Sequence, residues 1–152
     1  MPVLKTAEIR IEACKAGRPF VLAHGCFDIF HVGHLLHLRA AARLGRLFVS
    51  ITDDPFVSKG AGRPIFSAAK RAALIAELRC VHAVFVTDGA VAAITCLSPD
   101  VYVKGPDYHG GNLPEGSEVR IHGGSIAILM TERFSTTDIL KRLQHPEEVE
   151  PL

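Results

Sequence analysis

The chain has 152 residues, of which 48% are hydrophobic and 22% charged, with a formal net charge of +1. This composition argues against a disordered chain and fits one compact domain with a sizeable core. Because the sequence has no long basic run, we expect it to bind neither nucleic acid nor a membrane surface. No apolar stretch approaches the roughly 20 residues that span a bilayer. The segment 1–16 lacks a signal-peptide core, so we expect a cytoplasmic protein.

The cysteines are widely spaced and form no C-x-x-C pair; they are Cys14, Cys26, Cys80 and Cys96. This spacing favours neither a zinc knuckle nor a redox pair. We expect all of them to be reduced and mostly to serve as packing residues.

Short apolar runs alternate with helical stretches along the chain. The expected strands are 20–23, 47–51, 83–86, 101–103 and 126–129. Their apolar residues are continuous rather than alternating, which suits a sheet buried on both faces. Helices are expected over 6–16, 35–44, 67–78, 90–97 and 135–143, with one further turn at 118–122. Gly17 should end the first helix and Ser67 should cap the third.

Strand–helix alternation requires parallel pairing through crossovers. We therefore expect an α/β fold with a Rossmann-like, doubly wound, five-stranded parallel sheet in a single domain. Residues 1–143 should form this domain, and residues 144–152, which are acidic with two prolines, should be a flexible tail. Ligands of such sheets bind beyond the carboxyl ends of the strands, where the winding reverses.

The first strand runs into the segment 24–34, HGCFDIFHVGH. Gly25 allows a tight turn and a close approach of a ligand to the backbone. Gly33 lies where the next helix begins, and the free N–H groups and positive dipole end there attract anions. His31 and His34 lie three residues apart on one helical turn, so both imidazoles can donate to the same polyphosphate.

Two other interpretations of these histidines stay open. His31, His34 and His37 could be zinc ligands, although helical residues six apart point about 120° away from each other, which disfavours a shared ion. Alternatively, all of them are structural, hydrogen-bonded histidines. That interpretation leaves the strand, glycine turn and helix start around them unexplained.

The segment from Gly25 to His34 resembles the H-x-G-H signature of the cytidylyltransferase-like nucleotidyltransferases. Some members of this superfamily have threonine at the position of His31. With histidine there, the segment resembles the branch that contains glycerol-3-phosphate cytidylyltransferase and ADP-heptose synthase. The resemblance implies that His31 and His34 are catalytic. It implies nucleotide contacts for Gly25, Cys26, Phe27 and Gly33.

Two further segments resemble the same family. Lys59 lies in a glycine-containing loop after the second strand, where the family has a phosphate-binding lysine, so the resemblance implies a catalytic role. A solvated loop lysine is the alternative. Arg71 lies on an apolar helical stripe, so its guanidinium must find an anion or extend to water. The resemblance implies that Arg71 binds the nucleotide.

The segment 99–108, PDVYVKGPDY, follows the fourth strand and resembles the adenylyltransferase domain of ADP-heptose synthase. The resemblance implies that Lys104 and Asp107 line the cleft, near the base or the acceptor. Gly105-Pro106 replaces the Gly-Gly of the family. In the alternative interpretation, Asp107 only orders a turn.

The segment 131–139, TERFSTTDI, follows the fifth strand and has more hydroxyl groups than a helix cap needs. The family contacts the triphosphate here through I-S-T-T or C-S-T-T, and capping alone is the alternative. Met130 stands where cytidylyltransferases have arginine, and Arg133, at a shifted position, is the candidate to replace that arginine. The implied nucleotide-binding residues are Arg133, Phe134, Ser135, Thr136 and Thr137.

The resemblance covers about residues 19–143 and implies a nucleotidyltransferase. ATP, with Mg²⁺, is the favoured donor, and a phosphorylated sugar such as heptose 1-phosphate the acceptor. The acceptor attacks in line, without a covalent intermediate, and pyrophosphate leaves. CTP with glycerol 3-phosphate or a related phospho-alcohol is the alternative. A nucleotide-binding module without turnover is another alternative. A metal-dependent hydrolase is a third, but the sequence has no carboxylates clustered at the spacing of metal ligands. Relatives are commonly dimers, so we expect a homodimer and no metal site built by the protein.

Overall fold

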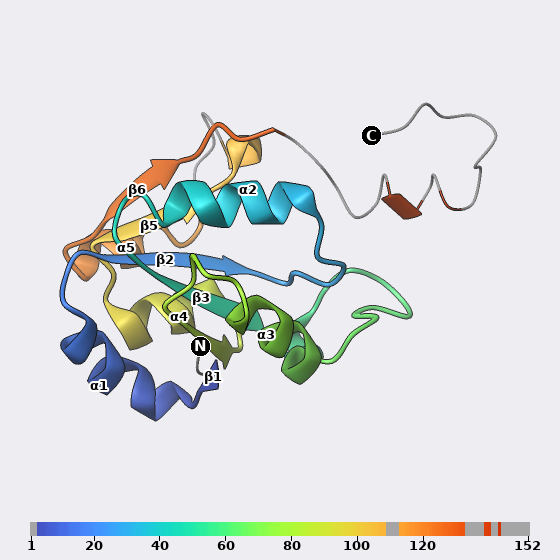
Figure 1. Ribbon diagram of the computed structural model, residues 1–152, viewed down its shortest axis with the longest axis horizontal. Coiled ribbons are helices and arrows are strands. Elements are labelled where there is room, and N and C mark those ends of the chain that lie inside the picture. The colour runs from blue at the N-terminus through green and yellow to red at the C-terminus, as the bar shows by residue number, and fades with distance from the viewer. Residues whose placement is uncertain (1–2, 109–112, 133–138, 141–142, 144–152) are drawn as a thin grey trace.

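Six parallel strands form one sheet in the order β1-β4-β3-β2-β5-β6 (Figure 1). The structure, a computed structural model, describes residues 3–108, 113–132, 139–140 and 143. The strands are β1 (Val3–Leu4), β2 (Phe20–Gly25), β3 (Arg46–Thr52), β4 (Ala83–Thr87), β5 (Val101–Lys104) and β6 (Ser125–Ile128). The five expected strands are all present, and each end lies within two residues of its expected position. The sixth, β1, was not predicted.

The helices are α1 (Thr6–Ala16), α2 (Val32–Ala41), α3 (Ala68–Ala76), α4 (Ala90–Leu97) and α5 (Gly116–Ile121). Ser67 precedes α3 as expected, but its side chain makes no capping hydrogen bond. Asp54 caps the helix instead, because its Oδ1 accepts from the backbone N–H of Ala68 at 2.8 Å. The expected helix 135–143 and the tail 144–152 lie largely outside the described residues. None of the described helices is long and apolar enough to cross a bilayer.

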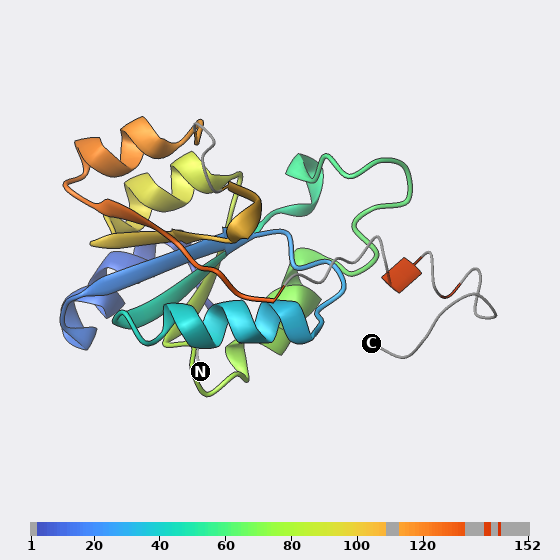
Figure 2. The same cartoon turned by 90° about the horizontal axis from the view of Figure 1, so that it is seen from above.

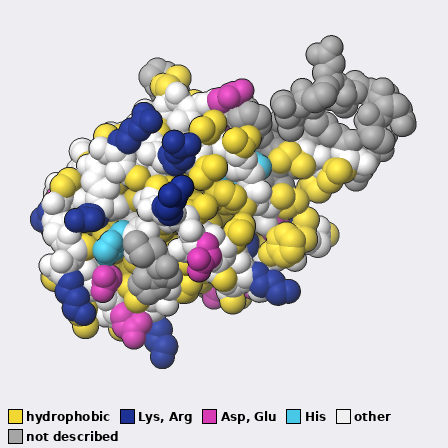
Figure 3. Space-filling model, viewed as in Figure 1, with side chains coloured by type: hydrophobic (Ala, Val, Ile, Leu, Met, Phe, Trp, Pro, Cys, Tyr) yellow, Lys and Arg dark blue, Asp and Glu magenta, His cyan; other side chains and the backbone are white. Residues whose placement is uncertain are grey.

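Helices cover both faces of the sheet (Figure 2). On one face, α2 and α3 pack their buried residues against the strands; these are Leu38, Ala41, Ala72, Ile75 and Ala76. On the other face, α1, α4 and α5 do the same with Ile9, Ala13, Ala93, Ile94, Leu97 and Val119. Both faces of each central strand are therefore buried, which is the physical reason for its continuous apolar sequence. On the face seen in Figure 3, Lys and Arg side chains are scattered among apolar and acidic ones.

The winding of the sheet reverses beside β2. The chain passes from β2 to β3 and β4 on one side, then returns to place β5 and β6 on the other. In register, Ala23 of β2 lies between Val49 of β3 and Val103 of β5. This arrangement confirms the predicted doubly wound, Rossmann-like class and puts the carboxyl ends of β2 and β5 at the switch point.

Candidate functional site

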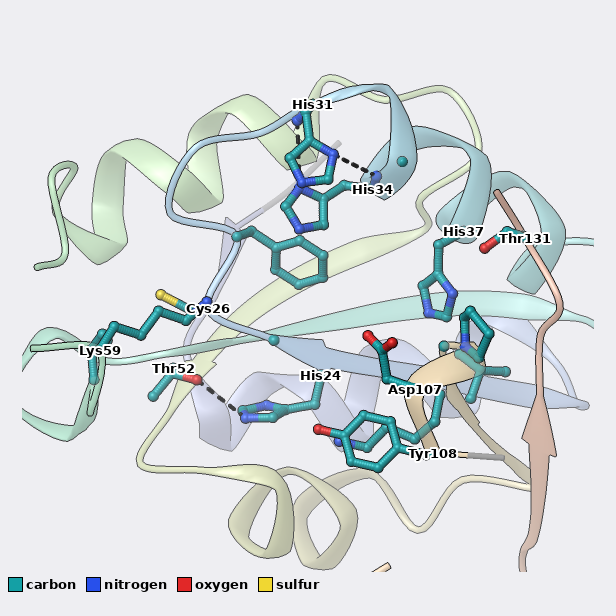
Figure 4. A pocket seen from close by; sticks show the side chains of 18 of the residues that line it. His24, Cys26, His31, His34, His37, Thr52, Lys59, Asp107, Tyr108 and Thr131 are labelled. Atoms are coloured by element: carbon teal, nitrogen blue, oxygen red, sulfur yellow. Dashed lines mark hydrogen bonds between the residues drawn. The ribbon is translucent and has the colours of Figure 1, made fainter. Parts of the chain in front are cut away.

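A cavity of about 460 Å³ opens at the carboxyl ends of β2 and β5, at the switch point of the sheet. Its walls come from the turn after β2, the start of α2, the loops after β3 and β5, and residues 131–132. Lys59 and Cys26 lie toward one end of it, and His37, Asp107 and Tyr108 toward the other (Figure 4). The sequence-predicted residues that line it are Gly25, Cys26, Phe27, His31, Gly33, His34, Lys59, Lys104 and Asp107.

The two histidines of the H-x-G-H segment form a stacked pair at the start of α2. His31 is the N-cap residue of the helix, and its Nδ1 accepts from the backbone N–H of His34 at 3.4 Å. The Nδ1 of His34 accepts in return from the backbone N–H of His31, also at 3.4 Å. The ring centroids are 3.8 Å apart with an interplanar angle of 20°. This reciprocal capping starts α2 three residues earlier than the expected residue 35.

The capping bonds determine the tautomer of both rings. Because each Nδ1 accepts a hydrogen bond, the proton of each neutral ring is on Nε2. Burial, and then the neighbouring charges of His31 and Lys59, lower the pKa of His34 to about 3. Burial and the charge of Lys59 also lower the pKa of His31. At neutral pH the pair therefore provides two neutral N–H donors, not two cations, and Lys59 is the cation beside them.

Aromatic packing holds the ring of His34 in place. The rings of Phe27 and His34 meet edge to face, with centroids 5.1 Å apart, and Phe30 lies 5.5 Å away on another side. Phe27 takes a φ of 50°, which is unusual for a residue with a side chain. A Cβ on Gly25 would lie 3.0 Å from Cε2 of Phe27, so glycine leaves room for this turn.

Lys59 lines the cavity from another segment, the loop between β3 and α3. The residues 56–59 line the cavity, and Lys59 itself is exposed. Gly60 and Gly62 follow with φ values of 93° and 75°, a conformation in which glycine has no steric cost. A lysine on such a loop can reach a triphosphate held by the start of α2.

At the β5 end, Lys104 is held by its neighbours. Its Nζ lies 2.8 Å from Oε1 of Glu115, which also accepts from the Tyr102 hydroxyl at 2.8 Å. The same Nζ lies 4.4 Å from the ring centroid of Tyr108, a cation–π contact. Burial would raise the pKa of Glu115, but Lys104 and its other hydrogen bonds hold it below its usual value. Lys104 is therefore charge-compensated, and Asp107 stands beside it in the lining.

Histidines that the sequence interpretation did not assign to this site also line the cavity. His24, near the end of β2, lies 3.1 Å from the Ser50 hydroxyl through Nδ1 and 3.2 Å from the Thr52 hydroxyl through Nε2. Burial, and then the charge of Lys104, lower its pKa to about 4. His37, one turn after His34, also has a pKa lowered by burial. His24 directly follows the apolar run 20–23, and this position at a strand end was the sequence signal that could have assigned it to the site.

A family model described as cytidylyltransferase-like matches residues 22–142. The chain belongs to the cytidylyltransferase-like family. The bifunctional protein HldE of Shewanella sediminis is 40% identical over 138 residues, and HldE of Azotobacter vinelandii is 38% identical over 139. These alignments cover 87% and 88% of this chain but 29% of each relative, so the chain spans under a third of the proteins it matches. A cytidylyltransferase-like chain with such relatives is a nucleotidyltransferase.

Solved structures share the fold of this cytidylyltransferase-like chain. The lipopolysaccharide core biosynthesis protein from Thermoplasma volcanium superposes with a TM-score of 0.61 at 27% identity, over 78% of this chain and 100% of that one. Pantothenate synthetase from Thermus thermophilus superposes with a TM-score of 0.64 at 13% identity, over 96% of this chain and 71% of that one. At 13% identity the second likeness shows the fold alone.

One predicted nucleotide-binding residue of this cytidylyltransferase-like chain lies behind the cavity wall. Arg71 on α3 is 2% exposed and does not line the cavity. Its guanidinium donates to the Asp54 carboxylate at 2.6 Å and to the backbone carbonyls of Cys26, Thr52 and Phe66. Of the two predicted environments for Arg71, an anion or water, the structure shows the anion, which the chain itself supplies with Asp54. Its predicted contact with the nucleotide stays a prediction.

The remaining predicted residues lie outside the described part of the chain. They are Arg133, Phe134, Ser135, Thr136 and Thr137. Thr131 and Glu132, directly before them, line the cavity. Within residues 3–108, 113–132, 139–140 and 143, no group of three or more His, Cys, Asp or Glu is arranged to hold a metal ion.

Proposed function

We propose that this chain transfers the adenylyl group of ATP to a phosphorylated sugar, with heptose 1-phosphate as the favoured acceptor, and releases pyrophosphate. One observation carries the proposal. The stacked pair of His31 and His34 at the start of α2 and Lys59 on the loop after β3 line the same cavity from different segments. Neutral N–H donors, the start of a helix and a long cationic side chain such as lysine are groups that bind a polyphosphate.

In the proposed reaction an oxygen of the acceptor phosphate attacks the α-phosphorus of the nucleotide in line. The new P–O bond forms as the bond from the α-phosphorus to the oxygen that bridges to the β-phosphorus breaks, and pyrophosphate leaves with that electron pair. The acceptor oxygen is already ionised, so no residue has to remove a proton. The Nε2–H groups of His31 and His34 and the ammonium of Lys59 stabilise the charge that builds on the phosphoryl oxygens.

The described residues fit a magnesium ion that arrives with the nucleotide. Mg²⁺ keeps several waters and is held by substrate phosphates with one or two carboxylates. The cavity lining offers the carboxylates of Asp107 and Glu132, and no protein cage among the described residues. When bound, the ion would neutralise part of the charge of the leaving pyrophosphate.

The resemblance of the segment 99–108 to the adenylyltransferase domain of ADP-heptose synthase supports ATP as the donor and a sugar phosphate as the acceptor. The HldE relatives support the nucleotidyltransferase class. Lys104 and Asp107, which lie in the segment 99–108, are the residues that we assign to substrate binding. CTP with glycerol 3-phosphate is the alternative within the class, and a nucleotide-binding module without turnover is the alternative outside it. The cytoplasmic location, the homodimer and the division at residue 143 stay predictions.

A panel of two nucleotides and two acceptors tests the proposal. The purified chain is incubated with Mg·ATP or Mg·CTP and with heptose 1-phosphate or glycerol 3-phosphate, and pyrophosphate release is measured. We expect release only with ATP and the sugar phosphate, and a product whose mass is that of the nucleoside diphosphate sugar. Release only with CTP and glycerol 3-phosphate would establish the alternative donor and acceptor. Nucleotide binding without pyrophosphate from any acceptor would overturn the proposed reaction.

A further inference from the structure

A buried carboxylate behind the cavity has no part in the reaction described above. Asp28 lies in the turn after β2, and its side chain is 0% exposed. Its Oδ1 accepts from the backbone N–H groups of Ile65 at 2.7 Å and Phe66 at 3.3 Å. Its Oδ2 forms an ion pair with Nε of Arg63. A buried carboxylate is costly unless it is paired. These partners of Asp28 all belong to the end of the segment 53–67 between β3 and α3, the Lys59 loop.

The beginning of the same loop is fixed by a second carboxylate. Asp54 accepts from the guanidinium of Arg71 at 2.6 Å and from the backbone N–H of Ala68 at 2.8 Å. Arg71 also donates to the carbonyl of Cys26 at 2.5 Å, in the turn that holds Asp28. Both ends of the Lys59 loop are therefore attached to the turn after β2 by charged hydrogen bonds.

Between these anchors the loop is exposed. The residues 58–62 are all exposed, and two of them are glycines in the left-handed region. Lys59 lies in this span, four residues before Arg63. Because the span is exposed and contains these glycines, the direction of Lys59 depends on where the two ends are held.

The turn that holds Asp28 also supports the histidine pair. Phe27, the residue before Asp28, packs its ring edge to face against His34. Asp28 and Phe27 thus extend from one turn to the two sides of the site. Burial alone would raise the pKa of Asp28, but Arg63 and the two backbone amides outweigh this effect and lower it.

We infer that Asp28, through its ion pair with Arg63, is a positioning residue that fixes the Lys59 loop against the histidine turn. In this role it sets the distance between Lys59 and the pair of His31 and His34. The inference rests on the proposed function only for the consequence on turnover. The attachment of the loop can be measured without nucleotide.

The first arm of the test measures that attachment. Trypsin cuts after Lys59, whereas Pro64 protects the bond after Arg63, so the new end at Gly60 reports the exposed span alone. We expect Asp28→Asn to raise the rate of this cut by about tenfold or more, which is the size of one lost hydrogen bond to a charged group. Arg63→Gln, which leaves the amides of Ile65 and Phe66 in place, should act in the same direction and serves if Asp28→Asn does not fold.

A matched control exists at the opposite end of the sheet. Asp100 likewise pairs with an arginine, Arg18, and accepts from the backbone N–H of Phe20 at 2.6 Å. Asp100→Asn removes the same kind of interaction far from the loop, so the cut after Lys59 should keep its wild-type rate. Wild-type cutting rates in both Asp28→Asn and Arg63→Gln would overturn the inference, as would an equal rise in Asp100→Asn.

The second arm separates positioning from general stability. In pyrophosphate release, Asp28→Asn should lower kcat/KM on the order of 100-fold, because a small misplacement of a catalytic group has such effects. In a Lys59→Met background the same substitution should cost less than about threefold further, since its effect passes through Lys59. An equal loss in both backgrounds would overturn the inference. If the wild type releases no pyrophosphate at all, the proposed function fails, and the trypsin arm still decides the inference.

Discussion

At the scale of single residues, burial sets the charge of the histidines around the cavity. The pKa of His34 is lowered to about 3 and that of His24 to about 4, first of all by burial. Both rings are neutral near pH 7, so they act as hydrogen-bonding groups. The ring of His34 has an Nε2–H donor because its Nδ1 accepts from the backbone of His31. An anionic triphosphate beside this donor would raise its pKa and strengthen the bond.

Removal of this donor should slow the reaction. We expect His34→Ala to lower kcat by about 10²–10³, the effect of losing one donor that stabilises a developing anion. His82→Ala is the matched control, because His82 precedes β4 at the other end of the sheet and pairs with Glu12 at 3.2 Å. Steady-state pyrophosphate release checks both variants. Near-normal turnover of a folded His34→Ala protein would contradict the catalytic assignment.

His24 should make the stability of the protein depend on pH. Its pKa is about 4 in the folded chain, against an ordinary value of 6.5. Between these values the unfolded chain binds more protons, so the stability contributed by neutral His24 is present above pH 6.5 and is lost as the pH falls toward 4. We expect His24→Gln to lose less stability than the wild type on acidification, by at most about 3 kcal/mol. Urea unfolding at pH 7.5 and 4.5 measures this, and parallel losses would refute it.

Arg71 and Asp28 differ in how far the sequence alone predicts their environment. The apolar stripe around Arg71 predicted a guanidinium that either finds an anion or extends to water, and the structure supplies the anion with Asp54, 17 residues away. Local patterns do not identify such a partner. Asp28 gave no signal at all, because its partner Arg63 lies 35 residues later on a loop without periodicity. The reciprocal capping of His31 and His34 was closer to prediction, since their spacing already placed them on one turn.

At the scale of elements, the close approach of the segment before β3 to the segment before β2 depends on a glycine. Gly45 precedes β3, and a Cβ there would lie 2.5 Å from the backbone carbonyl oxygen of Pro19. That oxygen accepts from the N–H of Arg46 at 2.9 Å, so it cannot move without loss of this bond. We expect Gly45→Ala to destabilise the fold by about 1–3 kcal/mol.

Gly89→Ala provides the comparison for this variant. No atom lies within 4 Å of a Cβ built on Gly89, and its backbone is extended with a φ of 173°. We expect this substitution to change the free energy of unfolding by less than about 1 kcal/mol. Urea unfolding at neutral pH compares the two variants. Equal stability of Gly45→Ala and Gly89→Ala would show that the contact at Pro19 relaxes freely.

Element types were predictable wherever local sequence determines them. The helix Thr6–Ala16 ends before Gly17, and the helix Ala90–Leu97 has its expected bounds. The short strand β1 was missed because its two residues have no pattern of their own and form the edge of the sheet, paired with β4. The cap of α3 was placed at the correct residue but given to the wrong side chain. Asp54 takes that role from a loop, and such distant capping leaves no local signal.

At the scale of the whole molecule, the alternation of strands and helices was enough to predict the switch point. The unusual residues of the sequence follow strands, and parallel pairing brings the ends of β2, β3 and β5 to one edge of the sheet. This is why residues as far apart as Gly25 and Asp107 line one cavity. Topology alone does not choose between adenine and cytosine, since that choice depends on side-chain positions around the base.

A ligand that joins these segments should stabilise the entire fold. A nucleotide bound at the switch point contacts the start of α2 and the loop after β3, and binding to the folded chain alone shifts unfolding by mass action. At 100 times its dissociation constant, Mg·ATP should add about 2.7 kcal/mol. For a domain of this size that corresponds to a rise in Tm of about 5–10 °C.

Thermal unfolding with Mg·ATP, Mg·CTP and adenosine checks this expectation. Mg·ATP should give the largest rise and adenosine little, because the proposed anion site binds phosphates. Chelation of Mg²⁺ with EDTA should reduce the rise, since the metal compensates the charge of the triphosphate. Lys59→Met should reduce it further, whereas Asp100→Asn should lower the Tm of the free protein and leave the rise unchanged. If neither nucleotide shifts Tm at millimolar concentration, the cavity at the switch point is not a triphosphate site.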